Sequence, residues 1–423
     1  MGSGIIPFPV ETSELDNGLG LIVVPMPSNG LACLWTIVRT GSRDEVEPGR
    51  TGFAHFFEHM MFRGTERYPT DAYQRCLIEL GTDPNAFTTD DLTAFHLSIA
   101  AADLDRIMEL ESDRFQNLKY AETDFRTEAG AVYGEYRKSK TDPFFVLYEA
   151  VRETAFERHT YGHTTMGYEK DIRAMPTLYD FSRRFFERYY RPDNTVLLVA
   201  GDVEPAAVRA LAGKHYGGWR PGYVVPEVPA EPAQVAEKRV EAAYAGQTLP
   251  LIWLAWKIGR ADPGNRTRAA ADLLVELTFG ETSDVYRKLV LKEQSLEFLT
   301  AYTNPNRDPS LVDVYARVKN PDKVDAVLAA LDLAAARASD ELVDRGRLET
   351  LKARERYGFL MQLETPDSVA DAFARPIAID GDLDGLEALY ATYASLTPED
   401  VRNAAREVFS TERRTVGLLR SAG

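Results

Sequence analysis

Two histidines and a glutamate stand close together in the stretch 51–65, TGFAHFFEHMMFRGT. On an α-helix, His55, Glu58 and His59 occupy positions i, i+3 and i+4, so their side chains share one face. Neutral imidazoles are good zinc ligands, and a nearby carboxylate that does not bind the metal can take a proton from a water. The stretch therefore predicts a metal-binding helix with Glu58 as general base. An amphipathic helix with two chance histidines is the alternative. The order His-x-x-Glu-His, in a chain with only 6 histidines, favours the metal.

A third ligand must come from elsewhere in the chain, because catalytic zinc keeps three protein ligands and a water. A helical pattern runs from Glu122 to about Lys138 and carries Glu128 and Glu135. These two glutamates are seven residues apart, so both lie near one face of the helix. This helix is the best source of the third ligand. A solvated helix face is the alternative interpretation of Glu128.

The remaining histidines carry a weaker signal. His159 and His163 are four residues apart, as in a metal pair, but the intervening Tyr161-Gly162 favours a loop. His96 lies in a predicted strand, where a surface or supporting role is expected. The chain contains no nucleophile elbow and no glycine-rich phosphate loop ahead of a helix.

Length and composition indicate a globular protein of more than one domain. At 423 residues the chain is too long for one ordinary core, and 44% hydrophobic and 27% charged residues are typical of soluble proteins. The net charge of −16 argues against a nucleic-acid surface and mildly favours basic peptides as ligands. No apolar run approaches the length of a membrane span. Two cysteines, Cys33 and Cys76, exclude a disulfide framework.

The first half of the chain alternates short strands and helices. Apolar runs at 19–24 and 31–38 predict two strands joined by a turn at 27–30. After the motif helix, a second helix is expected over 70–80, and 85–100 predicts a hairpin of two strands. Further predicted elements are helices over 103–118, 122–138 and 179–190 and a strand over 195–200.

The second half repeats the first at an offset of 220 residues. Asp180-Phe181 ahead of Thr195-Val196 matches Asp400-Val401 ahead of Thr415-Val416 at that offset. The same shift puts the strand at 31–38 on 251–258, and a constant offset over separate landmarks indicates a tandem duplication. Chance alignment of amphipathic elements is the alternative.

The metal-binding face is missing from the second copy. Val275, Thr278 and Phe279 stand at the positions offset from the three motif residues. None of these three side chains is a zinc ligand, so one half is expected to carry the metal and the other to shape a cavity.

We therefore expect an α+β fold of two tandem homologous domains around a cavity. Each domain is a mostly antiparallel sheet with helices packed on one face. The predicted divisions are a metal-bearing domain over 1–220, a proline-rich linker over 221–235 and a domain without metal ligands over 236–423.

Several segments together resemble the pitrilysin/insulinase family of zinc peptidases, in its shorter branch of mitochondrial-processing-peptidase-like proteins. The resemblance extends over nearly the whole chain, and His-x-x-Glu-His is the inverzincin signature. The segments that carry it are the motif at 55–59, its tail Phe62–Thr65, and the runs Asn85–Thr88, Tyr161–Glu169 and Arg191–Val203.

The resemblance implies roles for the motif residues. In the family, a glutamate follows His-x-x-Glu-His after about seventy-five residues, and here 75 residues separate His59 from Glu135. His55, His59 and Glu135 would hold one zinc ion per chain, with Glu58 as the base. Glu128 would assist catalysis as a carboxylate that orients a ligand.

The resemblance also implies a substrate-binding strand. The family segment that matches Asn85, Ala86, Phe87 and Thr88 is an edge strand that pairs with the extended substrate. Main-chain hydrogen bonds of this kind tolerate many peptide sequences. Strand chemistry alone predicts equally that the side chain of Phe87 belongs to the core.

One stretch departs from the family pattern. Family members that act alone carry an Arg and a Tyr in the second half, which hold the substrate carbonyl during attack. In the matching run Leu289–Phe298, Val290 stands in place of the Arg and Phe298, after a one-residue insertion, in place of the Tyr. Neither can donate a hydrogen bond. We therefore expect a heterodimer with a homologous partner that supplies the Arg and Tyr, which a homodimer could not do.

The sequence thus predicts a zinc metalloendopeptidase that hydrolyses peptides or unfolded segments in an enclosed cavity. The alternative is a non-catalytic assembly or peptide-binding subunit, which the missing Arg and Tyr favour and the complete metal motif disfavours. Residues 1–4 contain no basic or apolar signal-peptide region. The compartment stays open, with export slightly favoured, because related proteins occur both inside cells and in the periplasm.

Overall fold

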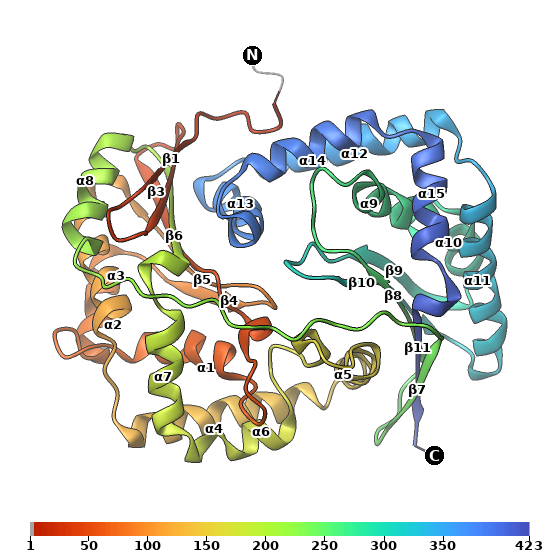
Figure 1. The fold of residues 1–423 in the computed structure, drawn as a ribbon, viewed down its shortest axis with the longest axis horizontal. Coiled ribbons are helices and arrows are strands. Elements are labelled where there is room, and N and C mark those ends of the chain that lie inside the picture. Colours follow the sequence, from red (N-terminus) through yellow and green to blue (C-terminus); the bar gives the residue numbers. More distant parts are fainter. Residues whose placement is uncertain (1–3, 423) are drawn as a thin grey trace. The chain divides into compact units, whose positions relative to one another are not determined.

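The computed structural model describes residues 4–422, which divide into two compact units (Figure 1). The first unit contains the chain up to Tyr136 together with His163–Val228 and Phe359–Asp384. The second unit contains Arg137–Gly162, Pro229–Gly358 and the chain from Gly385 onward. Each unit is therefore built from segments of both halves of the sequence.

The first unit contains a six-stranded sheet in the order β1-β2-β6-β3-β5-β4. Its strands are β1 (Glu11–Glu14), β2 (Gly20–Pro25), β3 (Leu31–Val38), β4 (Asn85–Thr88), β5 (Thr93–Ala100) and β6 (Thr195–Gly201). All neighbours are antiparallel except β2 and β6. Every residue of β3 after Leu31 is buried, as a continuous apolar run in a central strand predicts.

Helices cover both faces of this sheet. They are α1 (Phe53–Met60), α2 (Thr70–Leu80), α3 (Leu104–Asn117), most of α4 (Glu122–Ser139), α6 (Glu169–Ala174), α7 (Tyr179–Tyr189), α8 (Pro205–Tyr216) and α13 (Pro366–Asp380). Helix α1 lies beside β4 and β5, and α13 packs on β3 and β6. The indole Nε1 of Trp35 in β3 donates to Asp367 of α13 at 2.9 Å.

The second unit contains a five-stranded sheet in the order β7-β11-β8-β10-β9. Its strands are β7 (Lys238–Tyr244), β8 (Leu251–Ile258), β9 (Leu296–Thr303), β10 (Ser310–Val318) and β11 (Arg414–Ser421). Only β7 and β11 are parallel within this sheet. This is the order of the last five strands of the first sheet, with its parallel pair in the same place. Strands β3 and β8 lie at the predicted offset of 220 residues.

Alternate residues of β8 enter two different cores of the second unit. Leu251, Trp253 and Ala255 pack with α5, whereas Leu254 and Trp256 pack with α9, α11 and α15. The helices of this unit are α5 (Pro143–Ala155), α9 (Arg266–Phe279), α10 (Asp284–Tyr286), α11 (Val324–Asp340), most of α12 (Arg345–Gln362), α14 (Asp384–Ser395) and α15 (Pro398–Val408).

The predicted α+β class is confirmed, and so are two mostly antiparallel sheets with helices. Helices were expected on one face of each sheet only. The second face also has a helix, because each sheet receives one helix from the other half of the chain. Helix α5 belongs to the second unit and α13 to the first. The division of the sequence at a linker over 221–235 stays a prediction. The compact units do not follow this division, since each contains segments from both halves of the chain.

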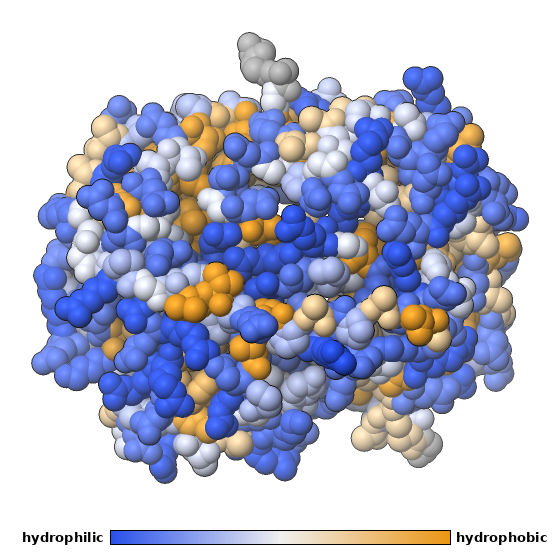
Figure 2. Space-filling view, in the orientation of Figure 1, coloured by the Kyte–Doolittle hydropathy of each residue, from blue (hydrophilic) through white to orange (hydrophobic). Residues whose placement is uncertain are grey.

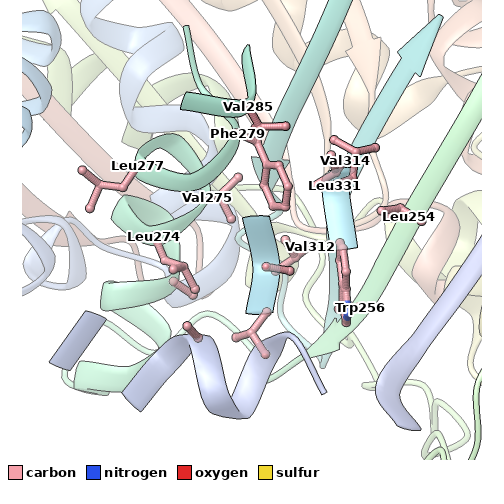
Figure 3. Close-up of a cluster of buried hydrophobic side chains, with 14 of the residues drawn as sticks. Leu254, Trp256, Leu274, Val275, Leu277, Phe279, Val285, Val312, Val314 and Leu331 are labelled. Atoms are coloured by element: carbon pink, nitrogen blue, oxygen red, sulfur yellow. The ribbon is translucent and has the colours of Figure 1, made fainter. Parts of the chain in front are cut away.

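Helix α9 occupies the place of the metal-motif helix in the second unit. Val275 and Phe279 are 2% and 0% exposed and pack in the core with Val312 and Trp256 (Figure 3). Thr278 donates its hydroxyl to the carbonyl of Leu274 at 2.7 Å. The positions matching the metal motif thus serve core packing in this copy.

The surface in Figure 2 is mostly hydrophilic, with apolar side chains in small patches. Acidic residues outnumber basic ones, 65 to 49. Between residues 4 and 422, no helix combines the length and the apolar character that crossing a membrane requires.

Candidate metal centre

Helix α1 is anchored by its apolar face and by a buried carboxylate. Its residues Phe53, Ala54, Phe56, Phe57 and Met60 are buried, which leaves the opposite face to the three motif residues. Hydrogen bonds at 2.7 Å run from the amides of Gly52 and Ala54 to the Glu45 carboxylate. These contacts satisfy amides that the first turn of a helix leaves free.

Gly52 begins this helix in a left-handed conformation, with φ of 89°. A Cβ at this position would stand 2.9 Å from the carbonyl oxygen of Met166. Glycine therefore permits both the turn into α1 and the close approach of the neighbouring chain.

Three ligand atoms converge above α1. The Nε2 atoms of His55 and His59 are 3.3 Å apart, and Oε2 of Glu135 lies 3.5 Å from each. Glu135 comes from α4, and the three ligand atoms lie within 4.8 Å of one another. The side chain of Glu135 is 47% exposed, so the group is open to solvent.

These separations fit a tetrahedral zinc ion. Zinc–nitrogen bonds of about 2.0 to 2.1 Å at tetrahedral angles put neighbouring ligand atoms about 3.3 Å apart. The two imidazoles and the carboxylate thus form three corners at the right spacing. Two nitrogen donors and one oxygen donor are also a ligand set that catalytic zinc uses.

A carboxylate on the far side of His59 fixes its orientation. The Nδ1 of His59 lies 2.9 Å from Oε1 of Glu128, whose other oxygen accepts from Nε of Arg63 at 2.7 Å and from its Nη2. Donation from Nδ1 leaves the Nε2 lone pair directed toward the ligand group. Glu128 therefore contacts the ring of His59 and does not belong to the group of three converging side chains.

Burial and hydrogen bonding separate the pKa values of the two histidines. Burial, with the nearby His59, lowers the pKa of His55 to about 4. The hydrogen bond to Glu128 raises the pKa of His59, against the effect of burial. His55 is thus neutral at pH 7, as a metal ligand must be, and His59 is the more basic donor.

Glu58 lies beside the candidate ligands and has a hydrogen-bond partner of its own. Its Oε2 accepts a hydrogen bond of 2.6 Å from the hydroxyl of Thr88 in β4. Burial raises the pKa of Glu58, and the Thr88 hydroxyl lowers it. A carboxylate with a raised pKa suits the exchange of a proton near neutral pH.

Strand β4 forms one edge of the first sheet. In the part of the chain that the structure describes, Asn85–Thr88 pairs with β5 alone. The ring of Phe87 is edge-on to Trp35 at 6.0 Å, so its side chain packs on the sheet. A cavity of about 370 Å³ lies next to this strand, and Glu58, Asn85 and Ala86 are among its lining residues.

The remaining histidines have other partners. His159 lies 3.0 Å from Asp308 through Nε2 and accepts from the amide of Tyr161 through Nδ1. The ring of His96 stacks on Trp35 at 4.2 Å. Among residues 4–422, the three-residue ligand group does not include any of them.

The motif alone does not predict two contributors to this site. Arg63 lies in the family-like tail four residues after His59, a spacing that continues the helix face. Glu45 lies upstream of the motif, and no local pattern connects it to the start of α1. Its role follows from the folded loop.

Comparison with known proteins identifies the relatives of this chain. Residues 24–169 match the family described as insulinase (peptidase family M16), and residues 178–354 match the peptidase M16 inactive domain. The zinc protease PqqE of Helicobacter pylori is 27% identical over 97% of this chain and 92% of its own length.

Two further comparisons extend this relationship. A crystal structure of a protease from Helicobacter pylori has a TM-score of 0.92 at 26% identity, covering 98% of this chain and 99% of that one. Subunit 1 of the bovine mitochondrial cytochrome b-c1 complex is 26% identical over 64% of this chain and 56% of its own length. Both domain types of the family follow one another along this sequence, and the chain therefore belongs to peptidase family M16.

Proposed function

We propose that this protein is a zinc-dependent endopeptidase. The observation that carries the proposal is the convergence of His55, His59 and Glu135, at separations of 3.3 to 3.5 Å, beside the carboxylate of Glu58. Relatives named zinc proteases support the choice of metal and reaction. One zinc ion per chain fits the one such ligand group that residues 4–422 contain.

The proposed chemistry is hydrolysis of a peptide bond. A bound zinc ion would act as a Lewis acid and lower the pKa of a water molecule in the site. Glu58 accepts a proton from the attacking water and returns it to the nitrogen of the leaving amine. Burial raises the pKa of Glu58, which makes its carboxylate a stronger base toward the water. Glu128, held by Arg63, keeps the His59 ring in the ligating orientation.

We propose that the extended substrate adds to β4. Backbone groups of Asn85, Ala86, Phe87 and Thr88 on the outer edge would bind the peptide main chain, as in other sheet-edge complexes. The hydroxyl of Thr88 ties this strand to Glu58. A substrate strand at this edge would therefore lie beside the proposed base. The adjoining cavity of about 370 Å³ would receive a side chain.

We further propose that full activity needs a homologous partner subunit. Val290 lies in a π-helical turn, Arg287–Lys292, and packs against the core of the second unit. Phe298 packs edge-on to Tyr315 at 5.8 Å. Neither side chain can donate a hydrogen bond to a substrate oxygen, and the loss of one such donor typically costs a hundredfold or more in rate.

A non-catalytic subunit is the second candidate, favoured by Val290 and Phe298 and by a relative named as a subunit of the cytochrome b-c1 complex. The two candidates differ in one experiment. Zinc content and cleavage of a quenched peptide are measured for the wild type, Glu58→Gln and a surface control, Glu122→Gln, each alone and mixed with a homologue that carries the Arg and Tyr.

A peptidase retains zinc in all three proteins, whereas Glu58→Gln loses cleavage by about a hundredfold to ten-thousandfold. Cleavage that appears only in the mixture supports the partner. Wild-type cleavage that is equal without the homologue contradicts the partner proposal. Absence of zinc or of cleavage in both settings favours the non-catalytic candidate.

A further inference from the structure

The first unit contains a second cavity, apart from the residues of the metal centre. Its volume is about 720 Å³, and it lies between the end of α3, helix α7 and the segment 218–220. Small-molecule sites typically have volumes of about 300 to 1,000 Å³. None of the three ligands, nor Glu58, lines it.

This cavity is basic in an acidic protein. Four cationic side chains and one acidic side chain line it: Lys119, Arg183, Arg191 and Arg220, with Glu187. The whole chain has 65 acidic and 49 basic residues, so this excess of positive charge is a local feature. Local cations in a concave site attract anions.

The guanidinium groups of Arg183 and Arg220 are available for a ligand. Between residues 4 and 422, no carboxylate forms an ion pair with Arg183, Arg191 or Arg220, although Nε of Arg191 donates to the carbonyl of Glu187. Lys119 pairs with Glu66 at 2.7 Å, but both side chains are largely exposed, and such a pair is easily exchanged for another anion. Guanidinium forks bind phosphate through two parallel hydrogen bonds.

Aromatic rings form the remaining walls. Tyr120, Tyr179 and Phe186 are half-buried, while Trp219 is 5% exposed. The hydroxyl of Tyr120 is within 2.8 Å of Ser182, and that of Tyr179 donates to the Tyr120 carbonyl. These contacts hold the rings in place. Fixed aromatic rings beside cations suit a ligand with a planar ring and an anionic group.

The cavity also adjoins the metal-binding helix through one layer of rings. Phe186 stacks on Phe57 of α1 with a centroid distance of 5.9 Å, and Tyr190 lies 5.6 Å from the same ring. Phe57 is buried on the face of α1 opposite the motif residues. A ligand here would be separated from α1 only by this aromatic layer.

We propose that this cavity is a binding site for a mononucleotide. The base packs against the aromatic walls, and Arg183 and Arg220 bind the phosphate. Inorganic phosphate can make only the contacts to the arginines, and adenosine can make only the contacts to the aromatic walls. Comparing these two compounds with the mononucleotide therefore separates the two contributions to its affinity. The proposal is independent of peptidase activity.

The test is calorimetric titration of the zinc-loaded full chain with AMP, adenosine and inorganic phosphate. We expect AMP to bind with a dissociation constant below about 1 mM and about tenfold or more tightly than either fragment. The double variant Arg183→Gln/Arg220→Gln should bind AMP at least about tenfold more weakly. Arg184→Gln on the same helix, outside the cavity lining, is the charge-matched control and should bind AMP normally.

Tryptophan fluorescence tests whether the ligand binds next to Trp219. AMP should change the emission of the wild type, and Trp219→Phe should abolish that change while calorimetric binding persists. Failure of AMP to bind at about 5 mM, or equal binding of AMP and phosphate, would overturn the proposal. So would unchanged affinity in the double variant or an equal loss in Arg184→Gln. The comparison of AMP with its fragments uses the wild type alone, so it stands even where a variant does not fold.

Discussion

The Nδ1 atom of His59 lies 2.9 Å from Oε1 of Glu128, two turns along α4 from the metal-ligating candidate Glu135. On the proposed assignment, one helix therefore provides both a metal ligand and the carboxylate that orients another ligand. Glu128 is 4% exposed, and Arg63 neutralises it. Burial alone would raise the pKa of Glu128, but the bonds from His59 and Arg63 lower it. Glu128 thus remains an acceptor at pH 7.

Replacement of Glu128 by Gln should weaken zinc binding. The amide oxygen can still accept from His59, but the negative charge that makes His59 more basic is lost. We expect the zinc dissociation constant, measured by competition with a chelator, to rise about tenfold to a hundredfold. Glu122→Gln near the start of the same helix should leave it unchanged, and an equal rise in both variants would contradict the role of Glu128.

Removal of the Thr88 hydroxyl should change the pH dependence of cleavage. The hydroxyl lowers the pKa of Glu58, so Thr88→Val should raise it. A base must be deprotonated to accept a proton, and activity will therefore be lost at a higher pH as the solution is acidified. We expect the acid limb of kcat/KM to move upward by about half a unit to one unit. Thr88→Ser keeps the donor and should retain the wild-type profile.

Metal removal should lower thermal stability, because a ligand that binds only the folded state stabilises it. Zinc at a hundred times its dissociation constant contributes about 2.7 kcal/mol. We expect chelation to lower the Tm of the wild type and added zinc to restore it. Glu135→Gln should lose most of this response, since it removes one of the three converging ligand atoms. A full response in that variant would exclude Glu135 as a ligand.

An ion pair in the second unit should make stability depend on acid pH. Arg266, at 2.5 Å, is the main cause of the lowered pKa of Asp400, which is about 2; Thr397 also contributes. A lowered carboxylate pKa adds stability above the unfolded value of 3.8 that disappears as the pH falls through about 2. Asp400→Asn should therefore cost about 1 kcal/mol at neutral pH after solvent screening.

This cost should shrink as the pH is lowered from about 5 to 2.5. The measurement is the difference in Tm between Asp400→Asn and the wild type over that range. Glu399→Gln removes the neighbouring exposed charge and should show no such trend. A difference that is constant with pH would contradict the assignment.

Local patterns in the sequence were enough to predict the elements near the metal centre. Helix α2 spans Thr70–Leu80 and β3 spans Leu31–Val38, within a residue of expectation, because periodicity and breakers act over a few residues. The start of α2 was less predictable. Pro69 occupies the N-cap, where serine, threonine, aspartate and asparagine are the residues that sequence patterns favour. The motif spacing also located the three ligand candidates that the structure brings together.

Other features depend on contacts between distant segments. Arg63 reaches Glu128 across 65 residues, and Trp35 reaches Asp367 across 332. The periodicity of the sequence cannot predict contacts between residues so far apart in the chain. The exchange of α5 and α13 between the units escaped prediction for the same reason. Each of these helices is amphipathic in an ordinary way, and only the folded chain shows which sheet it covers.

The exchange of helices has a consequence for the order in which the chain folds during synthesis. Helix α13 covers β3 and β6, yet it is made long after these strands. The face of the sheet that contains buried residues such as Trp35 therefore stays uncovered until residues 366–380 have been synthesised. A cut within the predicted linker, 221–235, would leave each half without one helix that its own sheet needs. The two halves are therefore expected to mature together, although their sheets share one strand order.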